Sequence, residues 1–93
     1  MDKEEAKDIL TKELEAYRKQ SYEDLLRLIN TQDTKEVTGH SGTVYPLEFL
    51  AVWDGKKDGN LRIIGAIDDG GLRAFIPLTE DFILTPDGSF VGE

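Results

Sequence analysis

The 93-residue sequence contains no cysteine, one histidine and one tryptophan. Without cysteine the chain has no disulfide, no thiolate nucleophile and no cysteine-ligated zinc. The single histidine, His40, has no further ligand at metal-site spacing along the chain, so we expect neither a metal centre nor a bound cofactor. No residue stands out as catalytic from the sequence.

Long apolar runs and positive charge are also scarce. No run approaches the ~20 apolar residues that a membrane span needs, and the charged residues 1–5 lack the apolar stretch of a secretory signal. The chain carries 11 Lys and Arg against 19 Asp and Glu, a net charge of −8. Nucleic acids and anionic membranes bind through Lys and Arg, so we expect neither as a partner. These features predict a cytoplasmic protein with one domain, residues 1–93.

What the sequence does contain begins with helical periodicity. Five apolar residues recur at steps of three or four and would form one stripe: Ala6, Ile9, Leu10, Leu14 and Tyr17. This stripe predicts a helix over residues 3–19. Ser21 then begins a sequence that resembles a capping box. We therefore expect a kink near Gln20 and a short second helix that ends near Asn30.

From Thr34 onward the apolar residues alternate with a period of two, which is typical of strands. The longest strand is expected over residues 44–54, where alternate residues share one face: Tyr45, Leu47, Phe49, Ala51 and Trp53. Shorter strands are expected at residues 35–38, 61–68 and 72–79. Turns rich in glycine would join them at residues 39–42, 55–59 and 69–71, and residues 82–84 would form a last apolar patch.

Two residues within the expected strands carry positional information. Gly65 predicts a bulge or a close approach of another backbone, because glycine packs poorly inside a strand. Pro77 cannot donate to a ladder, so its part of the fourth strand should lie at an edge or a bulge.

The order of elements predicts an α+β fold. Short connections between strands imply antiparallel hairpins, so a kinked helix would pack on one face of a four-stranded antiparallel meander. This order resembles the cystatin-like fold, and the helix pair is similar to the start of nuclear-transport-factor-two-like proteins. Residues 68–74, 77–79 and 86–90 also look like segments of small uncharacterised bacterial proteins, a similarity that implies no activity.

One local motif carries the cystatin resemblance further. Cystatin inhibitors have a Q-x-V-x-G sequence in their first hairpin, and this chain has Lys35-Glu36-Val37-Thr38-Gly39. The valine and the last glycine match, whereas Lys35 replaces the glutamine. The family's N-terminal glycine and its Pro-Trp pair are absent. The resemblance implies protease inhibition as one candidate activity.

Two loop motifs are rejected. In residues 54–60, Lys56 occupies the third position of an EF-hand loop and Gly65 the twelfth, where calcium needs oxygen ligands. The glycines of residues 39–42 and 69–71 lack the spacing and the following helix of a phosphate-binding loop.

Two sets of residues are candidates for binding. The first would lie on the sheet face away from the helix: Leu50, Val52 and Ile64. An apolar face that one helix layer leaves open is typical of a protein interface or of self-association. The second set would line a cleft between helix and sheet: Tyr45, Glu48, Trp53, Arg62 and Arg73. Glu48 would either form a polar centre there with an arginine or pair with it across the exposed face.

Three hypotheses for function follow. The first is a small binding domain that acts through protein–protein interaction or self-association of its sheet. The second is a small-molecule binder or weak enzyme that uses the cleft. The third is a cystatin-type protease inhibitor.

Overall fold

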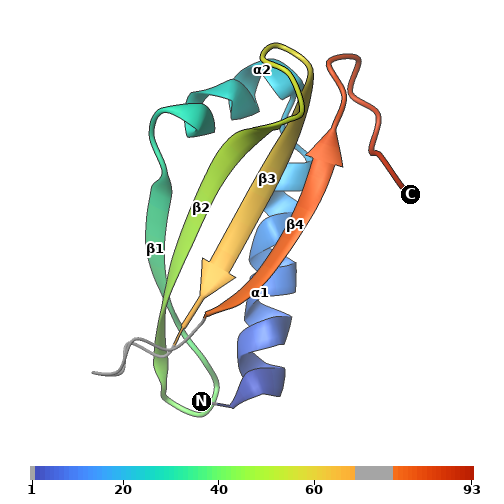
Figure 1. Cartoon of the computed structure of the whole chain (residues 1–93). Helices are drawn as coiled ribbons and strands as arrows, with labels where there is room; N and C mark the ends of the chain where they lie inside the picture. The colour runs from blue at the N-terminus through green and yellow to red at the C-terminus, as the bar shows by residue number, and fades with distance from the viewer. Residues whose placement is uncertain (1, 69–76) are drawn as a thin grey trace.

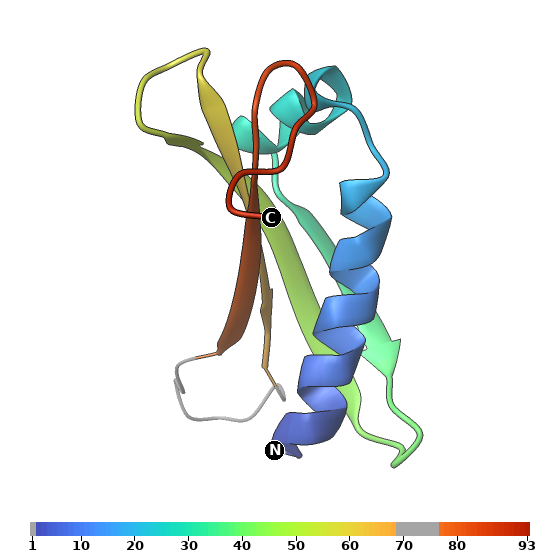
Figure 2. The same ribbon diagram turned by 90° about the vertical axis from the view of Figure 1, so that its right-hand side faces the viewer.

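A computed structural model describes residues 2–68 and 77–93 of the chain. The helices come first: α1 (Lys3–Arg18), α2 (Tyr22–Leu25) and the 3₁₀ helix η1 (Leu26–Ile29). The strands follow: β1 (Asp33–Thr38), β2 (Val44–Asp54), β3 (Asn60–Ile67) and β4 (Leu78–Leu84). Each strand pairs antiparallel with the next, in the order β1-β2-β3-β4, and α1 lies along one face of this sheet (Figures 1 and 2). The predicted α+β class is confirmed.

The helices begin at residues with capping side chains. Asp2 accepts a hydrogen bond from the backbone amide of Glu5 at 3.0 Å, which satisfies one of the free donors at the start of α1. Ser21 does the same for the amide of Asp24 at 3.1 Å, at the start of α2. The break between the two helices falls at residues 19–21, which confirms the kink expected near Gln20.

Among the described residues, the fourth strand extends further along the chain than the sequence predicts. β4 pairs with β3 from Leu78, opposite Ile67, to Leu84, opposite Leu61. Residues 82–84, expected as a last apolar patch, belong to this strand, and Phe82 and Leu84 are buried in the core. The turn expected at 69–71 and the strand residues 72–76 lie outside the described residues.

A polar residue on the covered side of β4 explains this difference. Glu80 is opposite Gly65, on the side of the sheet that α1 covers. Its carboxylate accepts a hydrogen bond at 2.7 Å from the hydroxyl of Thr11 on α1. A charged residue at that position breaks the apolar alternation along residues 78–84, so that the strand is hard to recognise from local pattern alone.

The core lies between α1 and the covered face of the sheet. Alternate residues of β2 point into it, as predicted: Tyr45, Leu47, Phe49 and Ala51 are buried, and Trp53 packs against the core at its end. α1 contributes its apolar stripe to the same cluster, with Ala6 and Leu10 fully buried. The helix therefore covers the face that the period of two defines.

Gly65 gives room for this packing. β3 stays in regular register at Gly65, opposite Phe49, with the same residue pairing on both sides, so no bulge is present. A Cβ atom placed on Gly65 would lie 2.9 Å from the Phe49 ring and 3.0 Å from Leu10 of α1. The close approach is thus made by side chains of β2 and α1, and the expectation of another backbone is corrected.

Replacing Gly65 by alanine should destabilise the protein. The added methyl group would force the Phe49 ring and α1 outward, and such overpacking typically costs about 1–3 kcal/mol. Urea unfolding followed by circular dichroism measures this loss. The smaller side chain of a Phe49→Leu change in the same chain should recover part of it, and a Gly65→Ala protein as stable as the parent would contradict the packing.

Candidate functional site

The face of the sheet away from the helices carries an apolar patch. α1, α2 and η1 all lie on the opposite side (Figure 2). We call this uncovered surface the open face. Its apolar residues come from β2, β3 and β4 and are cross-strand neighbours: Leu50, Val52, Ile64 and Ile83. Leu50 lies directly opposite Ile64, and Val52 remains 41% exposed.

One charged cluster interrupts this patch. Arg62 lies between Val52 and Ile83 in the same cross-strand row. Its guanidinium donates to Asp54 on β2 at 2.9 Å and also to Asp81 on β4. Arg62, on β3, therefore links its two neighbouring strands. These hydrogen bonds raise the pKa of Arg62 above its usual value, and the bond to Asp81 has the larger effect. The charge of Arg62 is thus offset within the face.

The residues expected to form a cleft are not brought together. Tyr45 and Trp53 lie on the covered face, whereas Glu48 and Arg62 lie on the open face. Glu48 is exposed, opposite Ala66, and makes no ion pair among the described residues. Arg73 lies outside the described residues. The helix–sheet cleft that the sequence suggested is therefore not a shared site for these side chains.

A buried carboxylate at the start of α1 is the polar centre that sequence reasoning missed. Glu5 is only 5% exposed. Its carboxylate accepts hydrogen bonds from the Ser41 hydroxyl at 2.6 Å, the Ser41 amide at 3.0 Å and the Tyr45 hydroxyl at 2.7 Å. His40 Nδ1 lies 2.9 Å from the same carboxylate, although the imidazole itself is 90% exposed. We call this group the Glu5 cluster.

These contacts keep Glu5 ionised. Hydrogen bonds from the Ser41 hydroxyl and then the Tyr45 hydroxyl lower the pKa of Glu5 to about 2, against the opposing effect of burial. The hydrogen bond between Tyr45 and Glu5 in turn raises the pKa of the Tyr45 hydroxyl. A signal was present in the sequence, because Glu5 stands beside Ala6 and four residues before Ile9, at the margin of the apolar stripe. Its acidic type suggested helix-end charge instead.

The chemistry of the Glu5 cluster is that of a structural link. The Ser41 hydroxyl donates to Glu5 rather than to His40, so the serine is not aligned with a base as a nucleophile requires. Every oxygen of the carboxylate is occupied by a donor from the β1–β2 loop or from β2. The cluster therefore fastens that loop to the start of α1. Among residues 2–68 and 77–93, no group of three or more acidic or histidine side chains could hold a metal ion.

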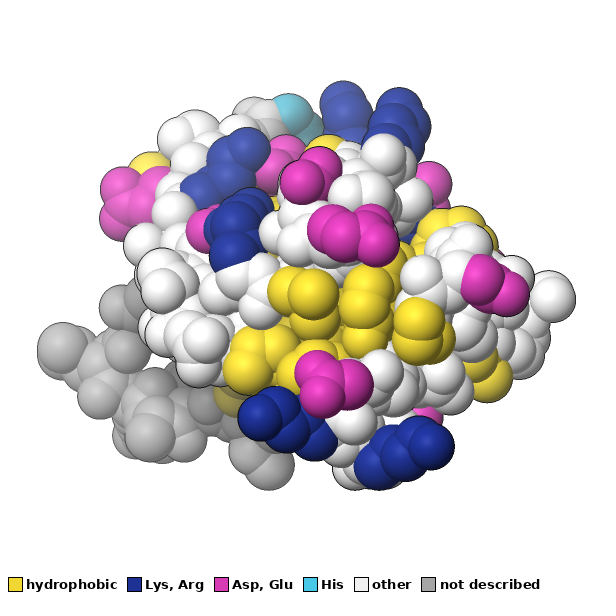
Figure 3. Space-filling view, turned by 90° about the horizontal axis from the view of Figure 1, so that it is seen from above, with side chains coloured by type: hydrophobic (Ala, Val, Ile, Leu, Met, Phe, Trp, Pro, Cys, Tyr) yellow, Lys and Arg dark blue, Asp and Glu magenta, His cyan; other side chains and the backbone are white. Residues whose placement is uncertain are grey.

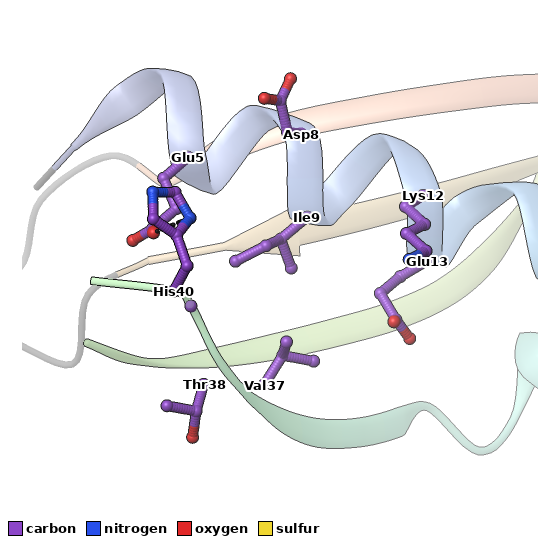
Figure 4. Close-up of a pocket in the computed structure, with 9 residues that line it drawn as sticks. Glu5, Asp8, Ile9, Lys12, Glu13, Val37, Thr38 and His40 are labelled. Atoms are coloured by element: carbon purple, nitrogen blue, oxygen red, sulfur yellow. Dashed lines mark ion pairs between the residues drawn. The ribbon is translucent and has the colours of Figure 1, made fainter. Parts of the chain in front are cut away.

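Next to the Glu5 cluster, a groove of about 280 Å³ runs between α1 and β1. Figure 4 shows Ile9 of α1 and Val37 of β1 pointing toward one another across it, with Thr38 directed away. Glu5 and His40 lie at one end of the groove and Glu13 at the other (Figure 4). The groove thus has an apolar middle and charged ends.

The end of the molecule that carries α2 and the β2–β3 hairpin also exposes apolar side chains. In Figure 3 they gather at the centre of the view, with acidic and basic side chains around them. Residues of the core cluster that remain partly exposed include Leu26, Ile29 and Trp53.

The fold and these surfaces define an α+β domain in which helices cover one face of an antiparallel meander, and no described helix lies on the other. Comparison of the chain with protein-family models, with curated proteins and with solved structures finds no match. Among the described residues, no helix is both long and apolar enough to cross a membrane.

Proposed function

We propose that the chain is a small binding module that associates through the open face of its sheet, with a second copy of the chain as the partner. The observation that carries this proposal is the uncovered apolar patch of Leu50, Val52 and Ile64, to which β4 adds Ile83. A sheet is stable when both faces avoid large apolar exposure, and an apolar patch on a small domain commonly marks an interface.

The pairing of Arg62 lowers the electrostatic cost of self-association. In a two-fold interface the same surface meets itself, so an unbalanced charge at its centre would repel. Here Arg62 lies between Val52 and Ile83 and pairs with both Asp54 and Asp81, so its positive charge is offset and the cluster keeps one net negative charge. Face-to-face packing would then bury the apolar side chains around a paired arginine, not an isolated one.

Further features of the proposal concern family and location. The order of a long helix followed by a four-stranded meander supports a cystatin-like or nuclear-transport-factor-two-like fold. Absence of cysteine supports a cytoplasmic location, and the resemblance of residues 68–74, 77–79 and 86–90 to small bacterial proteins supports a bacterial binding module. Inhibition of papain-like proteases would rest on Val37 and Gly39 alone, and we place it behind association through the sheet.

An Ile64→Asp change should convert the associated protein into a folded monomer. A carboxylate at the centre of the patch would have to lose its hydration on association, which typically costs several kcal/mol. Sedimentation equilibrium of the parent and the variant, over a range of concentrations, measures the effect. Thr79→Asp adds the same charge on β4 beyond the apolar patch and should leave the dimer largely intact.

Two outcomes would count against the proposal. One is a parent protein that stays monomeric at high micromolar concentration. The other is an Ile64→Asp protein that loses its circular dichroism signal, because Ile64 would then support the core instead of an interface. Val52→Asp offers a second variant at a more exposed position of the same patch.

A further inference from the structure

β1 forms one edge of the sheet, and no described strand pairs with its outer side. Within the described residues, β1 has β2 as its single strand neighbour. The Gly39 amide donates to the Thr43 carbonyl at 2.8 Å, so the backbone groups of Gly39 face β2. Backbone groups alternate between the two sides along a strand, so those of Val37 also face β2. The outward-facing groups belong to Thr34, Glu36 and Thr38.

The groove between α1 and β1 lies directly beside this edge. Its middle is apolar, with Ile9 on the helix wall and Val37 on the strand wall (Figure 4). Two side-chain contacts join the walls at its ends: His40 Nδ1 lies 2.9 Å from the Glu5 carboxylate, and Lys35 forms an ion pair with Glu13 at 2.6 Å. An exposed strand edge beside a groove of this kind has the two features that strand addition uses, namely free backbone groups and a pocket for alternate side chains.

We propose that this groove binds an extended peptide, which adds to the outer edge of β1 as a fifth strand. The peptide would place an apolar side chain between Ile9 and Val37 and basic side chains beside Glu36. This site lies at the β1 edge and does not include the apolar patch of Leu50, Val52 and Ile64, so the proposal stands whether or not the chain associates with itself.

The apolar preference follows from strand geometry. In an antiparallel pair, residues directly opposite one another have side chains on the same face. A peptide residue opposite Val37 therefore points toward α1, into the apolar middle of the groove. A valine or isoleucine there would cover Ile9 and Val37, both of which are partly buried and packed against the core.

The basic preference follows from charge. Peptide residues opposite Glu36 and Thr38 point to the other face, beside their side chains. Glu36 is exposed and makes no ion pair among the described residues. Asp8 and Lys12 also line the groove, but both stand on the helix wall, away from the outward backbone groups of β1. The net charge of −8 adds long-range attraction for a cationic peptide.

A second copy of β1 fits this edge poorly. If two copies of β1 paired antiparallel through their outer edges, residues with outward-facing backbone groups would have to lie opposite one another, so even-numbered residues would pair only with even-numbered ones. The two such registers with the longest overlap place Glu36 opposite Glu36, or Lys35 opposite Lys35. Like charges directly opposite one another destabilise a strand pair. The edge therefore favours a partner of different sequence.

The probe is a synthetic hexapeptide of alternating lysine and valine, acetylated and amidated at its ends. Titrated into ¹⁵N-labelled protein, it should shift the amide resonances of residues 34–40 and of Ile9, with much smaller shifts at Leu50 and Ile64. The same peptide N-methylated at the residues that would bond to β1 should lose binding, because the backbone hydrogen bonds supply the affinity. A hexapeptide of alternating glutamate and valine should bind far more weakly.

Charge reversal on the protein tests the site itself. Glu36→Lys should weaken binding of the lysine–valine peptide roughly tenfold or more, because it replaces attraction by repulsion at the edge. Glu23→Lys, on α2, changes the net charge equally and should have a much smaller effect. Circular dichroism of both variants checks that they fold, and the N-methylated peptide tests the site without any change to the protein.

Four results would overturn the proposal. They are no resonance shift at millimolar peptide, equal binding of the N-methylated peptide, equal weakening by Glu36→Lys and Glu23→Lys, and peptide shifts centred on the open face. Concentration-dependent shifts of residues 34–38 without peptide would instead assign the edge to a second copy of the chain.

Discussion

A Phe49→Ala protein should lose about 3–5 kcal/mol of its free energy of unfolding, which is a large part of the ~5–15 kcal/mol of a small domain. Phe49 is fully buried at the middle of β2. Its ring stacks on Tyr17 of α1, with centroids 4.5 Å apart, and fills the space that Gly65 leaves on β3. Truncation would open a cavity where α1 meets two strands.

The loss should extend beyond the cavity. The hydroxyl of Tyr17 donates to Asp33 at 2.7 Å, and Arg27 binds the same carboxylate at 2.7 and 3.0 Å. Without Phe49 the Tyr17 ring loses its stacking partner, so the link from α1 to the start of β1 should loosen as well. Amide hydrogen exchange at residues 33–35 should therefore accelerate.

Thermal and urea unfolding measure the change in stability. Val44→Ala, at the exposed start of the same strand, removes an apolar side chain whose propensity for strands is similar to that of phenylalanine. This change should cost well below 1 kcal/mol of the free energy of unfolding. If Phe49→Ala and Val44→Ala had the same effect, the core would not lie between α1 and the face of β2 that carries Phe49.

A Glu5→Gln protein should melt roughly 10 °C lower than the parent at pH 7, because a charged acceptor of three hydrogen bonds is replaced by an amide that also carries donors. The amide nitrogen would face the Ser41 or Tyr45 donors and leave a buried polar group without a partner. The β1–β2 loop should then detach from α1. Glu4→Gln removes the same charge from the exposed neighbouring position and should change the melting temperature far less.

The difference between parent and Glu5→Gln should depend on pH in a defined direction. The pKa of Glu5 is lowered in the folded protein from 4.5 to about 2, so between these values the unfolded chain binds more protons than the folded one. The stabilisation by Glu5 is thus complete above pH 5 and is lost as the pH falls from about 4.5 to about 2. The two melting temperatures should converge over that interval.

Other groups around Glu5 require a separate check. His40 faces the carboxylate but its side chain is 90% exposed, and solvent-exposed contacts between polar side chains contribute little, so His40→Ala should shift the melting temperature by only a few degrees. Asp33 also has a lowered pKa, through Arg27 and Tyr17, and adds acid sensitivity to parent and variant alike. A constant gap between parent and Glu5→Gln from pH 7 to pH 2 would show that Glu5 is not held ionised.

The groove between α1 and β1 depends on the same link. Glu5 holds the loop that follows Val37, and a Cβ atom on Gly39 would lie 2.5 Å from the Glu5 carboxyl carbon. The loop can approach the helix this closely because residue 39 has no side chain. Loss of the Glu5 cluster should therefore widen one end of the groove and weaken peptide binding at β1, while association through the open face continues.

Local sequence alone determined most of the secondary structure and the two faces of the sheet. Helical and strand periods are properties of neighbouring residues, so the stripe through Leu10 and the alternation through Phe49 could be recognised without any knowledge of contacts. The same alternation placed Leu50, Val52 and Ile64 on the open face. Short connections between strands then imposed an antiparallel meander.

Tertiary structure decided where charged residues belong. Glu5 is buried because Ser41 and Tyr45, 36 and 40 positions later in the chain, come to it with donors. Glu80 joins the covered side of β4 because Thr11 meets it there. No periodic pattern contains such pairings, since the free energy of burying a charge depends on partners that only the folded chain supplies. For the same reason the sequence suggested an ion pair between Glu48 and Arg62, whereas in the fold Arg62 pairs with Asp54 and Asp81.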